Sequence, residues 1–376
     1  MIIHMADLKT QYRSIEPEIQ AALAQVFERC QFGLGENVKE LEREIADYCD
    51  ARYAFGVNSG TDALLITLAA MGIGPGDEVI TTAFTFVATT EVIALLGATP
   101  VYVDIDPETF NIDSTKIEEA ITPRTKLILP VHLYGQCCEA RTICEIAKAY
   151  KLRVLFDGAQ AIGAQHYGRG IGAFGDATTL SFFPTKNLGA YGDGGMVLTN
   201  DSETAERVRL LRFHGSGGSY RYERIGYCSR LDELQAAVLR VKMRYLREWE
   251  DARRVHAAGY TSKLKATGLK TPMELPHNRH VYHQYTLRHD RRDEMVARLK
   301  EAGVHPGIYY NEPLHLQPAY AHVGYGEGDL PETEAAAREV LSIPVYPELS
   351  REELDFVAEA LVEAAEPEMT AAADGR

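Results

Sequence analysis

The segment YAFGVNSGTDALLITLAAMGIGPGDEVIT, residues 53–81, decides the fold class of this chain. Its short apolar run YAFGV is typical of a buried strand, a helical pattern follows from Thr61, and DEVIT begins a second strand. This strand–helix–strand order predicts a βα unit of a parallel sheet.

The same alternation continues along the chain. A helix is expected near residues 87–96, then the strands TPVYVD and TKLILPV, a helix over about 140–150 and the strand LRVLFD. The sequence therefore predicts an α/β fold with a mainly parallel sheet and helices on both faces. Functional residues of such a sheet gather at the ends of its strands.

The C-terminal part differs in pattern, and 376 residues are many for a single core. A helical stretch over about 231–264 is predicted to bridge to a smaller α+β domain with the strand VYHQYTLR, a helix over about 293–302 and further helices to about 364. We expect a large domain over 1–245, which begins with an amphipathic helix over about 15–27, and a small domain over 246–376. The last residues, EPEMTAAADGR, are expected to be frayed.

Composition excludes several classes of partner. A net charge of −15 argues against nucleic acid, whose phosphates require a basic surface. The six cysteines show no paired CxxC spacing, so we expect no metal site and no disulfide framework. No apolar run approaches the ~18 residues of a membrane span, and the N-terminus lacks the apolar core of a signal peptide. We expect a cytoplasmic protein that binds neither membrane nor nucleic acid.

Two strand ends carry residues that suit a charged ligand. Ser59, Gly60 and Thr61 lie where a strand runs into a helix, so free backbone N–H groups could bind a phosphate, although an ordinary helix cap explains the same residues. Asp157 ends the strand LRVLFD, and a buried carboxylate needs a partner such as a protonated ring nitrogen. A helix cap is the plainer role for this aspartate as well.

Lys186 follows the apolar run LSFF and precedes a glycine-rich stretch. A desolvated lysine can lose its proton and form a Schiff base with a carbonyl. A phosphate site, a strand-end aspartate and a strand-end lysine are together what pyridoxal phosphate requires. Phe86 could stack on the ring of this cofactor, and Gln160 could donate to its phenolic oxygen.

The blocks NSGTDAL, TFVAT, PVYVDIDPETFNID, PVHLYGQ, DGAQAIGA, SFFPTKNLGAYGDGGMV and SRLDELQAAVL extend this pattern over nearly the whole chain, from DLKTQY to PLHLQPAY and VLSIPVYPEL. Together they resemble the pyridoxal-phosphate-dependent nucleotide-sugar aminotransferases of the DegT/StrS group. The resemblance implies the fold type I aminotransferase fold and a homodimer with shared active sites. It also implies that an amino group passes from L-glutamate to a nucleotide-linked ketosugar, which yields an aminosugar for polysaccharide, glycan or antibiotic sugar biosynthesis. VYHQYTLR and PLHLQPAY favour a 3-keto UDP- or dTDP-sugar.

The resemblance also implies a role for each candidate residue. Lys186 would anchor the cofactor and move protons, and Asp157 would hold its pyridine nitrogen. The remaining cofactor contacts would be Gly60, Thr61, Phe86, Gln160 and Ser181, and the candidate substrate contacts are Arg230, Tyr309 and His315.

The chain departs from the family pattern at three places. Cys228 stands where many members have asparagine in NSR, FDGAQ replaces EDAAQ around Asp157, and Tyr309 stands where a histidine often faces the substrate. Two other functions stay open. A pyridoxal-phosphate sugar dehydratase is disfavoured because the related dehydratases have histidine at the position of Lys186. A non-catalytic relative that binds for regulation is disfavoured because Lys186, Asp157, Gln160 and Ser181 are intact.

Overall fold

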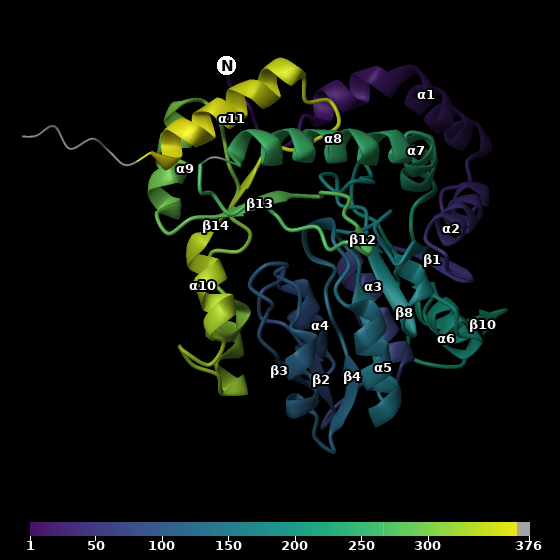
Figure 1. Cartoon of the computed structure of the whole chain (residues 1–376). Helices are drawn as coiled ribbons and strands as arrows, with labels where there is room; N and C mark the ends of the chain where they lie inside the picture. The colour runs from purple at the N-terminus through teal and green to yellow at the C-terminus, as the bar shows by residue number, and fades with distance from the viewer. Residues whose placement is uncertain (266, 367–376) are drawn as a thin grey trace, which may run out of the picture.

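The structure is a computed structural model that describes residues 1–265 and 267–366 (Figure 1). From residue 367 on, the tail that was expected to be frayed lies outside the described residues. A seven-stranded sheet forms the centre of the large part, in the order β1-β9-β8-β5-β4-β2-β3. Its strands are β1 (Tyr53–Val57), β2 (Glu78–Thr81), β3 (Thr99–Tyr102), β4 (Thr125–Ile128), β5 (Arg153–Asp157), β8 (Ala177–Ser181) and β9 (Gly195–Thr199).

All neighbouring strands of this sheet are parallel except β9, which is antiparallel to both β1 and β8. The strands β1, β8, β5, β4, β2 and β3 therefore share one carboxyl edge. The α/β fold with a mainly parallel sheet, expected from the alternating pattern, is confirmed.

Helices cover both faces of the sheet because successive strand residues point to opposite sides. On one face, Val79, Leu127 and Leu155 pack against α3 (Gly60–Ala70) and α4 (Ala88–Leu95). On the other face, the alternate residues Ile80, Ile128 and Phe156 pack against α5 (Ala140–Tyr150). The further helices of this part are α1 (Leu8–Arg29), α2 (Glu36–Tyr48), α6 (Ser202–Leu211) and α7 (Glu233–Met243).

The amphipathic helix expected over 15–27 is part of α1. Its buried residues Ile15 and Ile19 pack against Val238 and Val241 of α7.

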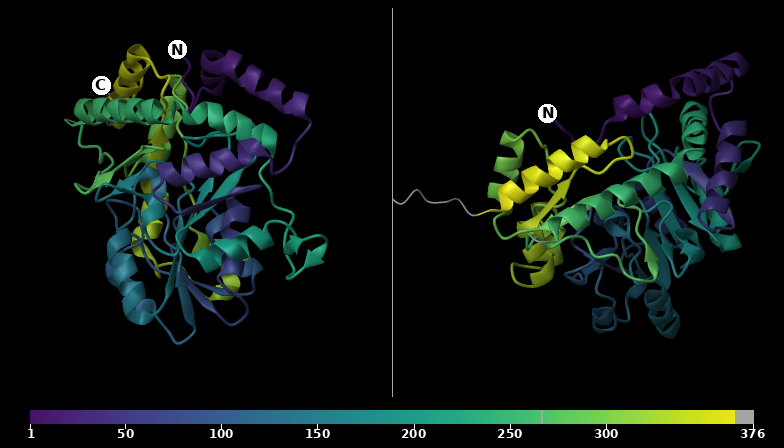
Figure 2. Two further views of the ribbon diagram at one scale, coloured as in Figure 1. Left: turned by 90° about the vertical axis from the view of Figure 1, so that its right-hand side faces the viewer. Right: turned by 45° about the horizontal axis from the view of Figure 1, so that its top comes forward.

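The helical stretch expected over 231–264 consists of two helices, α7 and α8 (Leu246–Leu264), separated at Arg244 and Tyr245. α7 packs against α1 and α2, whereas α8 crosses to the C-terminal part and runs beside α11 (Arg351–Ala365) (Figure 2). Because of this break, α7 and α8 run in different directions and pack against different helices.

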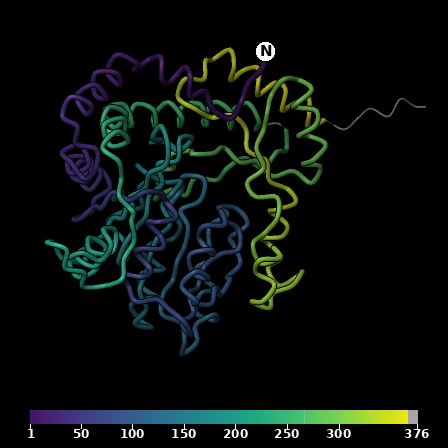
Figure 3. The backbone as a smooth tube through the Cα atoms, turned by 180° about the vertical axis from the view of Figure 1, so that it is seen from behind, coloured from purple at the N-terminus to yellow at the C-terminus, as the bar shows by residue number. Residues whose placement is uncertain are grey.

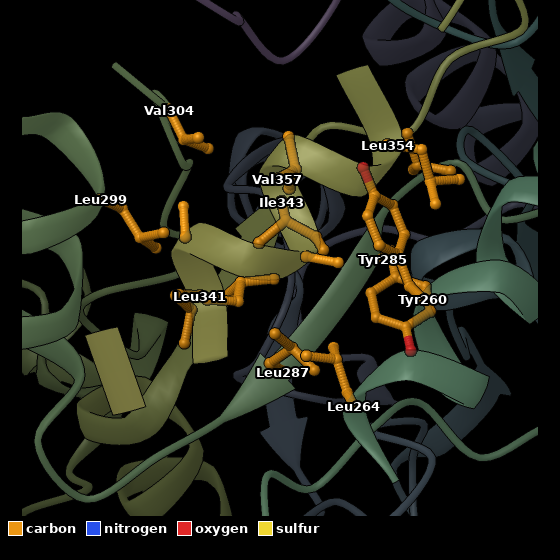
Figure 4. Packing of buried hydrophobic residues seen from close by; sticks show 14 of the residues in the cluster. Tyr260, Leu264, Tyr285, Leu287, Leu299, Val304, Leu341, Ile343, Leu354 and Val357 are labelled. Carbon is orange, nitrogen blue, oxygen red and sulfur yellow. The ribbon is translucent and has the colours of Figure 1, made fainter. Parts of the chain in front are cut away.

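The C-terminal part contains β13 (Tyr285–Arg288) paired antiparallel with β14 (Val340–Ile343), together with α9 (Arg292–Glu301) and α10 (Pro331–Glu339). Its core lies between β13, β14, α8, α9 and α11, with Tyr260, Tyr285 and Leu341 among the buried residues (Figure 4). The small α+β unit expected after the bridging helix is therefore present.

Only half of the predicted strand VYHQYTLR is a strand. The backbone N–H groups of Val281 and Gln284 donate to the carbonyls of Gly135 and Tyr134 in the large part, so these residues are not free to pair with β14. The apolar run LSFF is likewise only partly a strand, because β8 ends at Ser181, before Phe182 and Phe183. The chain turns there, and the N–H of Lys186 donates to the carbonyl of Phe183.

The division into domains over 1–245 and 246–376 stays a prediction, and several contacts cross it. Ile3 pairs with Val304, so the N-terminus lies beside the C-terminal helices (Figure 3). The short strand β12 (Asn278–Arg279) pairs with β6 (Gln165–His166) of the large part. The two parts are therefore joined by backbone pairing as well as by side-chain packing.

The remaining elements are short. The strands β7 (Arg169–Gly170), β10 (Ser216–Gly218) and β11 (Arg221–Tyr222) and the 3-10 turns Ser114–Lys116, Glu118–Ala120, Leu133–Gly135, Ile171–Ala173, Leu314–Leu316 and Pro318–Val323 complete the described chain. Across the described ranges, none of the helices is both long and apolar enough to cross a membrane. The cytoplasmic location stays a prediction.

Candidate active site

A cavity of about 510 Å³ lies at the carboxyl edge of the sheet and collects residues from both parts of the chain. Asp157 ends β5 and Ser181 ends β8, while Gly60 and Thr61 follow β1 by a short turn. Because these strands are parallel, their carboxyl ends meet at one edge, which brings together side chains that are far apart in sequence. All seven residues predicted to contact the cofactor line this cavity: Gly60, Thr61, Phe86, Asp157, Gln160, Ser181 and Lys186.

Asp157 is a buried carboxylate, only 5% exposed, with neutral hydrogen-bond partners. The hydroxyl of Thr89 donates to Oδ2 at 2.8 Å, and the backbone N–H of Ala159 donates to Oδ1 at 3.0 Å. Burial raises the pKa of Asp157, while these two hydrogen bonds and the charge of Lys186 oppose the rise. Burial disfavours the ionised form of this carboxylate unless a cation lies beside it, and a protonated ring nitrogen in the cavity would be such a cation.

Lys186 lies in the turn after β8, and its side chain is the amine of the cavity. Burial lowers the pKa of Lys186 to about 8, although the negative charge of Asp157 opposes the change. A larger share of its amine is therefore unprotonated near neutral pH than in an exposed lysine. This is the state in which an amine attacks a carbonyl carbon.

The N-terminus of α3 lies close against the end of β8. Ser59 caps the helix by accepting a 3.0 Å hydrogen bond from the N–H of Asp62, and Gly60 begins the first turn. A Cβ atom added to Gly60 would come within 2.7 Å of Cβ of Ser181, so only glycine allows the helix end to approach β8 this closely. The N–H groups of a first helical turn attract an anion.

Gln160 and two tyrosines line the side of the cavity near Asp157. Oε1 of Gln160 accepts a 2.7 Å hydrogen bond from the N–H of Tyr134, so its Nε2 is the atom that donates to the hydroxyl of Tyr310, at 3.2 Å. Tyr309, a predicted substrate contact, also lines the cavity. Phe86 is 56% exposed there, which leaves its ring available to a ligand.

The structure does not bring the other two predicted substrate contacts to this cavity. His315 is buried elsewhere, 3.2 Å from Oε1 of Glu334. The guanidinium of Arg230 lies over the ring of Phe213 and donates to Sγ of the exposed Cys228 at 3.2 Å.

Among the polar cavity residues that sequence reasoning missed, three come from the C-terminal part beyond residue 245: Arg253, His283 and Gln284. Nδ1 of His283 lies 3.2 Å from Oδ1 of Asn187, whose Nδ2 donates to the carbonyl of Val281, so the histidine carries its proton on Nδ1. Burial, with Lys186 and Arg253 nearby, holds the pKa of His283 well below its usual range. The motif VYHQYTLR contains two of these residues, but nothing local marks which side chains enter a cavity.

Outside this cavity, potential metal ligands of Glu139, His166 and His277 lie within 4.8 Å of one another. Each histidine has a hydrogen-bond partner: Nε2 of His277 lies 2.9 Å from Oε1 of Glu139, and Nδ1 of His166 lies 2.7 Å from Oδ1 of Asn278. These pairs account for the cluster by ordinary hydrogen bonding.

The residues of the cavity fit pyridoxal phosphate. The glycine-lined helix end suits its phosphate, the buried Asp157 its pyridine nitrogen, and the amine of Lys186 its aldehyde.

Comparison with known proteins assigns the chain to a family of aminotransferases. Residues 13–362 match the DegT/DnrJ/EryC1/StrS aminotransferase family. The chain belongs to this family. The family membership expected from the sequence blocks is thereby confirmed.

Two relatives of this DegT/DnrJ/EryC1/StrS chain cover nearly its whole length. It is 53% identical to the pleiotropic regulatory protein of Geobacillus stearothermophilus, over 96% of this chain and 98% of that protein. It is 45% identical to the UDP-2-acetamido-2-deoxy-3-oxo-D-glucuronate aminotransferase of Pseudomonas aeruginosa, over 96% of this chain and 99% of that enzyme.

Solved structures of family members share the fold of this chain. The crystal structure of S. venezuelae DesV has a TM-score of 0.95 and 43% identity, and covers 97% of this chain and 99% of its own. NtdA of Bacillus subtilis, solved with its cofactor PMP bound, has a TM-score of 0.88 and 36% identity, and covers 94% of this chain and 82% of its own. The expected fold type I aminotransferase architecture is confirmed.

Proposed function

We propose that this chain is a pyridoxal-phosphate-dependent aminotransferase that moves an amino group from L-glutamate to a nucleotide-linked ketosugar, namely a 3-keto UDP- or dTDP-sugar. One observation carries the proposal: the amine of Lys186, the buried carboxylate of Asp157 and the N-terminus of α3 line one cavity. Family membership supports it, and so do relatives named as keto-sugar aminotransferases.

When bound, pyridoxal phosphate supplies an aldehyde that bonds to amines and a ring that withdraws electrons from the carbon next to the nitrogen. Nζ of Lys186 would hold the cofactor between reactions. Freed by the donor amine, the same atom would accept the proton from the α-carbon of the donor and give it up again before the product leaves. Asp157 favours the protonated pyridine nitrogen, and each pKa unit of that preference is worth about 1.4 kcal/mol.

The first N–H groups of α3 and the hydroxyls of Thr61 and Ser181 would hold the cofactor phosphate, and the exposed ring of Phe86 would stack on the pyridine. Nε2 of Gln160 would donate to the phenolic oxygen. Tyr309, which lines the cavity at the position of a histidine in many members, is the proposed contact of the sugar.

The regulatory name of the Geobacillus relative suggests a non-catalytic protein as the alternative. A lysine whose pKa burial lowers to about 8 beside a buried aspartate favours catalysis, because a binding protein needs neither. A sugar dehydratase is disfavoured by the same lysine.

Two copies of the chain are proposed to share their active sites. The loop over 214–230 extends at the edge of the large part, where β10 is labelled in Figure 1, and exposes Tyr220 at 91% and Ile225 at 97%. Large apolar side chains at the surface are typical of a protein–protein contact. Sedimentation of the purified protein would give the mass of a dimer, and a monomer at micromolar concentration would contradict this part of the proposal.

The cofactor-loaded protein should be incubated with L-glutamate and a panel of UDP- and dTDP-linked 3- and 4-ketosugars. We expect 2-oxoglutarate and one aminosugar in equal amounts, and no product from Lys186→Ala that is folded by circular dichroism. An absorption band of bound cofactor without turnover on any ketosugar would favour the regulatory alternative. Full turnover by Lys186→Ala would refute the assignment of the lysine.

A further inference from the structure

Arg253 is a buried cation on the wall of the active-site cavity that the C-terminal part contributes. It belongs to α8, is 7% exposed, and lines the cavity together with Lys186 and His283. Burial lowers the pKa of Arg253 to about 10, which still leaves it charged at neutral pH. The cavity therefore contains a permanent positive charge besides the amine of Lys186.

Arg253 forms no ion pair in the described part of the chain, although the charges of Glu348 and Glu250 oppose the fall in its pKa. Nη1 donates to the carbonyls of Val345 at 2.5 Å and Tyr282 at 3.3 Å, and Nε is buried with no acceptor. Within the described part of the chain, no carboxylate lies within the 4.0 Å of an ion pair with Arg253. The neighbouring Arg254, in contrast, forms an ion pair with Glu274 at 2.6 Å. A buried charge that forms no direct ion pair is costly, and binding of an anion reduces that cost.

We infer that Arg253 binds a substrate carboxylate in the active-site cavity. The planar fork of a guanidinium matches a carboxylate, and weak hydration makes arginine suited to a buried contact of this kind. The inference rests on the proposed function, since that reaction brings carboxylates into the cavity. Arg230, which the sequence suggested as a substrate contact, lies against Phe213 outside the cavity of its own chain.

A second unsatisfied group lies on the same wall. Gln284 is 8% exposed and lines the cavity, and its Oε1 is buried without a hydrogen-bond partner. Such groups are paired in nearly all folded proteins, so Gln284 adds a second unsatisfied polar group to the wall that carries Arg253.

The carboxylate has two possible sources. One is the amino donor, because glutamate has a carboxylate on its α-carbon and another on its side chain. The other is a uronic ketosugar, the kind of substrate named for the Pseudomonas relative. The chemistry at Arg253 is the same for both, and binding measurements separate them.

The experiment measures binding to the cofactor-loaded protein by calorimetry, with glutarate as probe for the donor. UDP-glucuronate, compared with UDP-glucose, is the probe for the sugar. Arg253→Gln removes the charge, and Arg254→Gln is the matched control, since it removes an adjacent arginine of α8 that pairs with Glu274. If the donor is the source, Arg253→Gln weakens glutarate binding about 10- to 150-fold. If the sugar is the source, Arg253→Gln abolishes the preference for UDP-glucuronate over UDP-glucose. If Arg253→Gln both weakens glutarate binding and abolishes this preference, the result also supports a carboxylate site.

Arg253 also holds two backbone carbonyls, so Arg253→Gln has to retain the circular dichroism and the cofactor absorption of the wild type. If Arg253→Gln does not retain them, Arg253→Lys is measured in its place. Lysine keeps the positive charge but lacks the planar guanidinium, so this variant is expected to weaken binding of the affected probe about tenfold. Unchanged binding of both probes in a folded, cofactor-loaded Arg253 variant overturns the inference, as does an equal loss in Arg254→Gln. Neither result touches the proposed function, which fails only if the wild type transaminates no ketosugar.

Discussion

The hydroxyl of Thr89, in the first turn of α4, donates a 2.8 Å hydrogen bond to Oδ2 of Asp157 at the end of β5. The N–H of Ala159 occupies the other carboxylate oxygen at 3.0 Å. Both partners are neutral, so the structure orients the carboxylate without neutralising it. Its charge remains available to a cation inside the cavity.

Asp157→Asn is expected to retain some cofactor but to lose most of the rate of glutamate deamination, about 100-fold or more. The amide keeps the shape but no longer favours the protonated pyridine, and two pKa units correspond to a factor of this size. Single-turnover absorbance after mixing with glutamate measures the rate. Thr89→Val is the control, since loss of one hydrogen bond of about 1 kcal/mol costs only about fivefold. A near wild-type rate for Asp157→Asn would leave the aspartate a purely structural role.

Attachment of the cofactor should depend on pH through Lys186. Because burial lowers its pKa to about 8, the reactive neutral amine increases about tenfold per pH unit below 8 and then levels off. Absorbance after mixing apoprotein with pyridoxal phosphate follows the rate, with Lys186→Ala as the blank. A rate that keeps rising to pH 10 would mean that Lys186 titrates like an exposed lysine.

The same shift affects the stability of the apoprotein. In the unfolded chain the lysine keeps its proton up to the ordinary value of 10.5, whereas in the folded chain it loses the proton near pH 8. The unfolded state thus binds more protons between about pH 8 and 10.5, so the contribution of Lys186 to the free energy of unfolding rises with pH in this window. Urea unfolding measures the free energy of unfolding of wild type and Lys186→Met across this window. At pH 7 the variant is expected to be the more stable of the two, and the difference is expected to shrink as the pH increases. A constant difference would contradict the pKa shift.

Gly60→Ala is expected to weaken cofactor binding and to lower the free energy of unfolding by about 1–3 kcal/mol. The new Cβ would come within 2.7 Å of Cβ of Ser181, which pushes the helix end away from β8. Gly74→Ala is the matched control, because a Cβ at Gly74 meets no atom within 4 Å. Cofactor titration and urea unfolding measure both effects. Equal behaviour of the two variants would show that the close approach at Gly60 is not needed.

Cys228→Asn is expected to tighten cofactor binding modestly, by at most the ~1.5–3 kcal/mol of a hydrogen bond to a charged group. Cys228 is exposed in the loop over 214–230, and its neighbour Ser229 accepts from the N–H of Asn58 and donates to Asp62 at the start of α3. An asparagine there would offer an amide donor to the phosphate bound by a second copy, whereas a thiol is a weak donor.

The dissociation constant of the cofactor, compared among wild type, Cys228→Asn and Cys228→Ala, tests this position. The alanine variant has no donor and should resemble the wild type. Unchanged or weaker binding in Cys228→Asn would mean that the cysteine only packs as a small apolar residue.

The sequence by itself predicted the mainly parallel sheet and the residues proposed to contact the cofactor, because both leave local signals. A strand that ends in Asp157, a glycine at a helix start and a lysine after a buried strand are recognisable from neighbouring residues, and the resemblance to one family assigned their roles. The alternation of strands and helices likewise requires only short-range periodicity.

Only the tertiary structure decided which C-terminal residues enter the cavity. Arg253 lies in a helix of mixed charge, where an arginine that points to solvent and one that is buried have the same sequence pattern. Val281 leaves the predicted strand because Gly135, 146 positions earlier in the sequence, accepts its N–H. Such contacts depend on how the two parts of the chain pack, and the free energy that selects them comes from surfaces that meet only in the folded molecule.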